Sequence, residues 1–205
     1  GGITSNGKTN ITNNGGNIQG SITTNGNAPL SIENSGSGSI GGSISASGDA
    51  PISITNSDNA KVAGNIEVSG DAPISISNSS TQGIVGDITA SGDAPISISN
   101  SGSIGGDIKT AGNAELKINN SGSGSIGGAI TASGDAPISI TNSDNATLVG
   151  GVSASGGGKV SIENKGSANI AGEIKVSDDV ALNIKNTGNA TLQSDIINSG
   201  SGALS

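Results

Sequence analysis

Ile, Leu and Val recur along this chain at fixed intervals, and the intervals define a repeat of 22 residues. Counted from a leading glycine, the apolar positions are the third, the eleventh, the thirteenth and one near the end of the unit. In the unit that begins at Gly42 they are Ile44, Ile52, Ile54 and Val62. The units begin at Gly20, Gly42, Gly64, Gly86, Gly106, Gly128, Gly150 and Gly172. A short period that runs through a whole chain is the signature of a solenoid.

Each unit predicts three short strands separated by turns. The middle segment, Pro51–Asn56, alternates apolar and polar residues as a half-buried strand does. Helices are disfavoured, because β-branched Ile dominates and Gly or Pro interrupts every few residues. We predict an all-β parallel β-helix (β-solenoid) of about nine coils, with 22 residues and three strands per coil. Stacking at about 4.8 Å per coil gives a rod about 45 Å long.

The repeat predicts one solenoid domain over residues 1–205, with an incomplete first coil 1–19, full coils 20–193 and an incomplete last coil 194–205. The unit that begins at Gly86 has 20 residues, because its last turn is two residues shorter. At the start of the chain, Ile11–Asn13 matches Ile32–Asn34. At the end, Ile196–Leu204 matches Ile32–Ile40 position by position. The chain therefore begins and stops within a repeat, still in the core pattern.

The turn residues fit the same coil. Position 7 is Gly in most units and is expected to need a positive φ, as at Gly48, Gly70, Gly92, Gly112 and Gly134. Proline precedes the middle strand, where a missing N–H is tolerated, at Pro29, Pro51, Pro73, Pro95 and Pro137. Position 9 is mostly Ala, which predicts a thin coil.

Position 15 is asparagine in every full unit. It lies two residues beyond an inward apolar residue, so its side chain is expected to point inward at a corner. Stacked amides bond to one another from coil to coil and also satisfy turn backbone groups. We predict a structural asparagine ladder of Asn34, Asn56, Asn78, Asn100, Asn120, Asn142, Asn164 and Asn186.

Position 8 is acidic in three consecutive units, at Asp49, Asp71 and Asp93. One interpretation is a turn in which Asp accepts backbone N–H bonds. The other is a row of carboxylates that repel each other and recruit Ca²⁺ through their oxygens. We favour the turn, since the dense GGxGxD pattern of calcium-binding nonapeptide repeats is absent.

The amino-acid composition argues against several classes of function. The chain lacks His, Cys, Met and aromatic residues, and with them the commonest zinc, haem and iron–sulfur ligands and the thiol and Ser-His-Asp nucleophiles. We expect no enzyme and no cofactor. A net charge of −8 opposes binding to nucleic acid and to anionic membranes. No apolar run approaches the length of about 18 residues that a membrane span needs.

Outward positions of the middle strand carry hydroxyls in several units, among them Ser53, Thr55, Ser75 and Ser77. Such an array has some likeness to an ice-binding face, which is a remote alternative. Charged or amide residues interrupt it at Lys117/Asn119, Glu163 and Asn183/Lys185. Solvated hydroxyls on a parallel sheet are the simpler interpretation.

The segments Gly-x-Ile, Ile-Ser-Ile-x-Asn and Asn-Ser-Gly-Ser-Gly-x-Ile recur along nearly the whole chain. With them the chain resembles secreted bacterial β-helix surface proteins of the autotransporter-passenger and filamentous-haemagglutinin kind. The resemblance implies export, a right-handed coil and a role in adhesion or in a matrix. The aromatic ladders common in those passengers and the haemagglutinin secretion domain are absent.

Two functions are compatible with these features. In the first, an extracellular or cell-surface structural protein stacks head to tail with copies of itself into a filament. Its contact would involve Ile3, Ile11, Ile18, Ile196 and Leu204. In the second, the chain is a segment of a large secreted adhesin that binds a host surface or its glycans. We expect the first.

Overall fold

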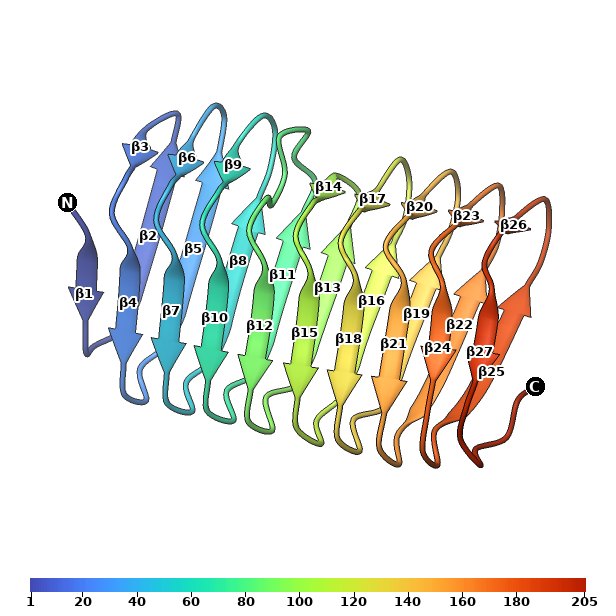
Figure 1. The fold of residues 1–205 in the computed structure, drawn as a ribbon. Coiled ribbons are helices and arrows are strands. Elements are labelled where there is room, and N and C mark those ends of the chain that lie inside the picture. The colour runs from blue at the N-terminus through green and yellow to red at the C-terminus, as the bar shows by residue number, and fades with distance from the viewer.

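The computed structural model describes all 205 residues, which form a parallel β-solenoid of 27 short strands without helices (Figure 1). In Figure 1 the nearer strands run downward, the fainter strands behind them run upward, and the chain advances from left to right. This is a right-handed coil, the hand favoured for parallel crossovers. The predicted fold class, with about nine coils and three strands per coil, is confirmed.

The first strand of every coil belongs to a ten-stranded parallel sheet, here called the first sheet. Its strands, in order, are β1 (Ile3–Ser5), β4 (Ile22–Asn25), β7 (Ile44–Ser47), β10 (Ile66–Ser69), β12 (Ile88–Ser91), β15 (Ile108–Ala111), β18 (Ile130–Ser133), β21 (Val152–Ser155), β24 (Ile174–Val176) and β27 (Ile196–Asn198).

The middle strands form a nine-stranded parallel sheet, the second sheet. Its strands are β2 (Thr9–Asn14), β5 (Leu30–Ser35), β8 (Ile52–Asn56), β11 (Ile74–Asn78), β13 (Ile96–Asn100), β16 (Leu116–Asn120), β19 (Ile138–Asn142), β22 (Lys159–Asn164) and β25 (Ala181–Asn186).

Two-residue strands make the third side of the coil. They are β3 (Asn17–Ile18), β6 (Ser39–Ile40) and β9 (Lys61–Val62), then β14 (Ser103–Ile104), β17 (Ser125–Ile126), β20 (Thr147–Leu148), β23 (Asn169–Ile170) and β26 (Thr191–Leu192). Ile84 joins the two groups through single bridges to Val62 and Ile104.

The register keeps like residues on top of one another. Ile52 pairs with Ile74, which lies 22 positions further along the sequence. The spacing is shorter in two coils: Ile3 pairs with Ile22 in the first coil, and Ile88 pairs with Ile108 in the coil that begins at Gly86. The residues missing from the later coil come out of the corner between β13 and β14. Coil length therefore changes in a corner while the strands stay in register.

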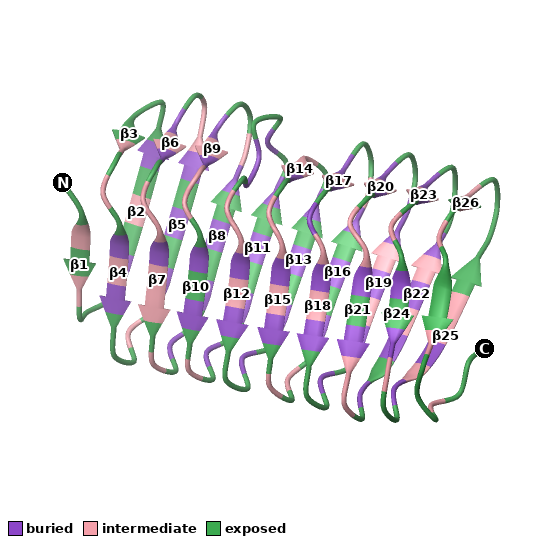
Figure 2. Ribbon diagram, in the orientation of Figure 1, coloured by how far each residue is buried: buried purple, intermediate pink, exposed green.

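Apolar side chains fill the interior as continuous ladders. The core is one cluster of 38 buried residues, and each interior Ile contributes about 1.5–3 kcal/mol, much of it offset by the entropy of ordering a Gly- and Ser-rich chain. Figure 2 shows the alternation of buried and exposed residues along the second sheet, and it shows less burial in β1 and β27 at the two ends. Gly48 and Gly70 adopt φ of 108° and 121°, as predicted for the corner that follows the first strand.

The last segment does not take the place that its similarity to Ile32–Ile40 suggests. Ile196 pairs with Ile174 in the first sheet, and Leu204 bridges to Leu182 in the second. The reason is connectivity. After β26 the chain turns into the first sheet, as it does in every coil, and a strand can pair there only with the strand one coil before it.

Candidate functional site

A continuous chain of side-chain hydrogen bonds runs through one corner of the rod. Each Asn donates from Nδ2 to Oδ1 of the Asn in the next coil, over 2.8 to 2.9 Å. The members are Asn13, Asn34, Asn56, Asn78, Asn100, Asn120, Asn142, Asn164 and Asn186. Asn13 was missing from the predicted set, although its match to Asn34 was visible in the sequence.

The interior amides also hold the corner itself. Asn142, which is buried, donates to the backbone oxygens of Ala146 at 3.3 Å and Asn169 at 3.1 Å. At the open end, Asn186 is exposed, accepts from Asn164 and donates to the Ala190 oxygen at 3.0 Å. No buried side-chain nitrogen or oxygen lacks a partner, so these amides serve the structure.

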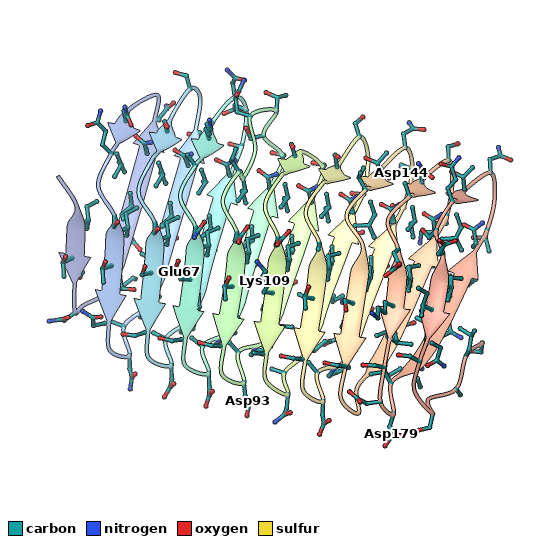
Figure 3. The ribbon with its side chains drawn as sticks, viewed as in Figure 1. Glu67, Asp93, Lys109, Asp144 and Asp179 are labelled. Carbon is teal, nitrogen blue, oxygen red and sulfur yellow. The ribbon has the colours of Figure 1, made fainter.

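The acidic row lies on the corner between the first and second sheets, at the lower edge of Figure 3, where Asp93 is labelled. Asp49 Oδ1 accepts the N–H of Asp71 at 3.3 Å, and Asp71 Oδ1 accepts that of Asp93 at 2.9 Å. Asp93 Oδ1 accepts the N–H of Asn113 at 2.8 Å. These carboxylates thus bond backbone groups of the next coil, not of their own turn.

No group of three or more His, Cys, Asp or Glu side chains lies close enough together to hold a metal ion. One oxygen each of Asp49, Asp71 and Asp93 is already bonded to a backbone N–H. The geometry of this row therefore fits a backbone-capping role.

A second set of carboxylates bonds backward along the rod. Asp58, Asp144 and Asp178 have positive φ angles of 58°, 62° and 55°. Asp144 Oδ2 accepts the N–H of Gly122 in the preceding coil at 2.9 Å. Sequence analysis missed this set. The available signal was an Asp at the position that holds glycine in the neighbouring coil, as Gly122 does.

Lys109 lies between two carboxylates on the outer surface of the first sheet. Its Nζ is 2.9 Å from Asp107 and 3.2 Å from Asp87, one coil apart (Figure 3). The hydrogen bond from Lys109 lowers the pKa of Asp107, with help from the N–H of Ala129. The bonds to Asp107 and then Asp87 raise the pKa of Lys109. In the second sheet, Lys185 and then Lys165 lower the pKa of Glu163.

Three shallow depressions mark the outer surface, and two of them are of similar, larger volume. One, of about 340 Å³, crosses the first sheet among Ser and Thr residues, and Glu67 is the charged residue in its lining (Figure 3). The other, of about 330 Å³, follows a row of prolines on the second sheet, Pro51, Pro73 and Pro95, and reaches Glu115 and Lys117. Both are open troughs between strands.

The end coils expose positions that are buried elsewhere. Ile196 is 40% exposed and Leu204 57%, whereas their predecessors Ile174 and Leu182 are 0% and 1% exposed. At the other end Ile3, Ile11 and Ile18 are half-buried and pack on one side only, against the core. All five residues of the predicted contact are thus terminal rungs of the apolar ladders.

No protein-family model, curated protein or solved structure matches the chain. The β-solenoid architecture implied by the resemblance to bacterial surface proteins is present. The structure contains no apolar helix of the length needed to cross a bilayer.

Proposed function

We propose that the chain is an extracellular structural protein whose solenoids stack head to tail into a filament or matrix fibre. One observation carries the proposal: both end coils expose apolar rungs, and each rung would be covered by a further coil of the same kind. Ile3 and Ile196 are the two ends of one ladder in the first sheet. Leu204 and Ile11 end two neighbouring ladders of the second sheet: the Leu204 ladder begins at Thr9, and the Ile11 ladder runs to Ile184.

The interior of the rod supplies the model for the contact. Within the rod, the C-terminal face of each coil packs against the N-terminal face of the next. The exposed face of the last coil is therefore complementary to the exposed face of the first. The free edges of β1 and β27 also offer backbone groups for pairing. A contact between two different surfaces of one molecule gives a ring if its rotation closes and an open filament if it does not. The two surfaces here are the opposite ends of a rod, so stacking along its axis gives the filament.

Composition and resemblance support an extracellular or cell-surface location. The chain lacks the oxidisable residues Cys, Met, Trp and Tyr. Hydroxyls and amides dominate its outward positions, and its repeat resembles that of secreted bacterial β-helix surface proteins.

The exposed rungs equally fit further coils of one longer polypeptide, which favours a second candidate, a segment of a secreted adhesin. Its partner would be a host surface or its glycans. An ice-binding role stays remote, because charges interrupt the hydroxyl array at Lys117, Glu163 and Lys185.

Negative-stain electron microscopy of residues 1–205, with sedimentation across a concentration series, separates the two. The filament predicts unbranched fibres one solenoid wide, with an axial repeat of about 45 Å and a length that grows with concentration. Short rods of one size at every concentration would reject the filament and leave the adhesin segment as the better account.

A further inference from the structure

The two ends of the rod differ in charge as well as in position. Lys8 is the one charged side chain among residues 1–32, and it is exposed in the corner between β1 and β2. At the opposite end, the corner between β24 and β25 carries the exposed carboxylates of Asp178 and Asp179. The corner itself contains no lysine, and the exposed Lys175 and Lys185 lie on the strands that flank it, β24 and β25. The ends therefore carry opposite charges at the same corner.

The register places Lys8 and these carboxylates on one edge of the rod. Thr9 pairs with Leu30, and its N–H donates to the oxygen of Pro29, so Lys8 lies on the corner that joins the first and second sheets. Asp93 and Asp179 mark this edge along the bottom of Figure 3. Along the edge the side chains are mostly acidic, and Lys8 stands at its beginning.

We propose that charge sets the polarity of the stack: the Lys8 corner of one copy docks over the Asp178–Asp179 corner of the copy before it. This inference rests on the proposed head-to-tail function and names the partner surface as a second copy of this chain. A head-to-head contact would bring two Lys8 corners together, and a tail-to-tail contact would bring together two pairs of carboxylates. Both reversed arrangements carry like-charge repulsion.

The distance across the contact makes the effect dependent on salt. Residues 199–202 form the last corner and cover Asp178, since the N–H of Ser201 donates to the Asp178 oxygen. Lys8 of the next copy would therefore lie about two coil spacings, about 10 Å, from these carboxylates. That separation matches the screening length of about 10 Å at 0.1 M salt. The attraction acts mainly on the rate of association.

Lys8→Glu tests the proposal, with Lys117→Glu as the matched control. Lys117 is exposed on the second sheet, far from both ends, and its reversal changes the net charge equally. Fibre growth is followed by light scattering at about 20 mM and about 500 mM NaCl, after circular dichroism has verified the strand content. We expect Lys8→Glu to slow growth about fivefold at low salt, with the difference vanishing at high salt. Lys117→Glu should stay within about twofold of the unmodified chain.

A charge swap completes the test. The double variant Lys8→Glu/Asp179→Lys restores opposite charges at the contact, and it should recover most of the lost growth rate. Asp178 is kept, because its Oδ2 accepts the Gly156 N–H. Asp179→Lys alone is measured beside the double variant, because Asp179 Oδ1 accepts the Ser201 hydroxyl. Equal slowing by Lys8→Glu and Lys117→Glu, or no rescue in the double variant, would overturn the charge inference while fibres of the unmodified chain preserve the proposed function. An unmodified chain that stays monomeric would overturn both.

Discussion

Asn34 donates from Nδ2 to Oδ1 of Asn56 at 2.9 Å, and Asn56 repeats the same bond to Asn78. Each interior amide thus accepts a hydrogen bond at Oδ1 from the Asn of the preceding coil and donates one from Nδ2 to the Asn of the following coil. It also closes its own corner, as Asn56 does by donating to the oxygen of Ala60 at 3.3 Å. Removing one amide therefore takes hydrogen bonds from several coils at once, and it leaves the Oδ1 of the next Asn without a donor, as at Asn78.

Asn142→Ala should destabilise the rod by about 2–3 kcal/mol, because it leaves the buried Oδ1 of Asn164 without a donor. It also removes one bond each from Asn120 Nδ2 and from the backbone oxygens of Ala146 and Asn169. Urea unfolding followed by circular dichroism measures the loss. Asn145→Ala is the control, since Asn145 lies exposed in the same corner. Equal losses for the two variants would contradict the structural role of the ladder.

Gly128→Ala should destabilise the rod by about 1–3 kcal/mol or prevent folding. A Cβ at Gly128 would overlap the backbone of Gly106 in the preceding coil. Gly127→Ala provides a neighbouring control, because its Cβ would meet the nearest atom, the Ile104 oxygen, at 3.8 Å. Thermal unfolding of the two variants decides the matter, and a Gly128→Ala chain as stable as Gly127→Ala would show that the coils separate easily.

Asp144 has a positive φ, which is unfavourable for a residue other than glycine, and its carboxylate accepts the N–H of Gly122. Two substitutions separate the cost of the φ angle from the gain of the hydrogen bond. Asp144→Gly loses the bond from Gly122 but relieves the positive φ, so its stability should change little. Asp144→Ala loses the bond and keeps the strain, and it should be less stable than Asp144→Gly by about 1 kcal/mol. The difference in urea midpoint between the two variants is the measurement, and the reverse order would refute this account.

Lys109→Met should lower stability at neutral pH and have less effect in acid. The folded state lowers the pKa of Asp107, mainly through Lys109. Stabilisation from this carboxylate is therefore present above the ordinary Asp pKa and is lost as the pH falls through the folded-state value. Without Lys109, Asp87 and Asp107 repel while both are charged. The pH dependence of the urea midpoint tests this, with Lys117→Met as control, and an unchanged profile would argue against the pair.

The repeat made the architecture predictable, because the positions of Ile52 and Ile54 recur in every coil and only stacking buries them all. The register of the last segment follows from the 22-residue count, which puts Ile196 after Ile174, and local similarity alone misplaces it. Ile196-Ile197-Asn198 resembles the middle strand at Ile32, yet chain connectivity places it beside Ile174 in the first sheet.

The hydrogen bonds between Asp carboxylates and the backbone of a neighbouring coil were not predictable for a different reason. Turn propensity describes bonds within one corner, whereas Asp71 bonds to the N–H of Asp93 in the next coil. Likewise, the acceptance of the Gly122 N–H by Asp144 depends on a contact between residues 22 apart. Such pairs emerge once the register is known.

The asparagine ladder also gives the rod a direction. All eight bonds point the same way: the donor Nδ2 belongs to the coil nearer the N-terminus, and the acceptor Oδ1 belongs to the next coil toward the C-terminus. Aligned amide dipoles polarise one another, so each bond strengthens its neighbours. The buried corner therefore gives the rod a polarity. A coil added at either end continues the ladder only if its asparagine has the same orientation.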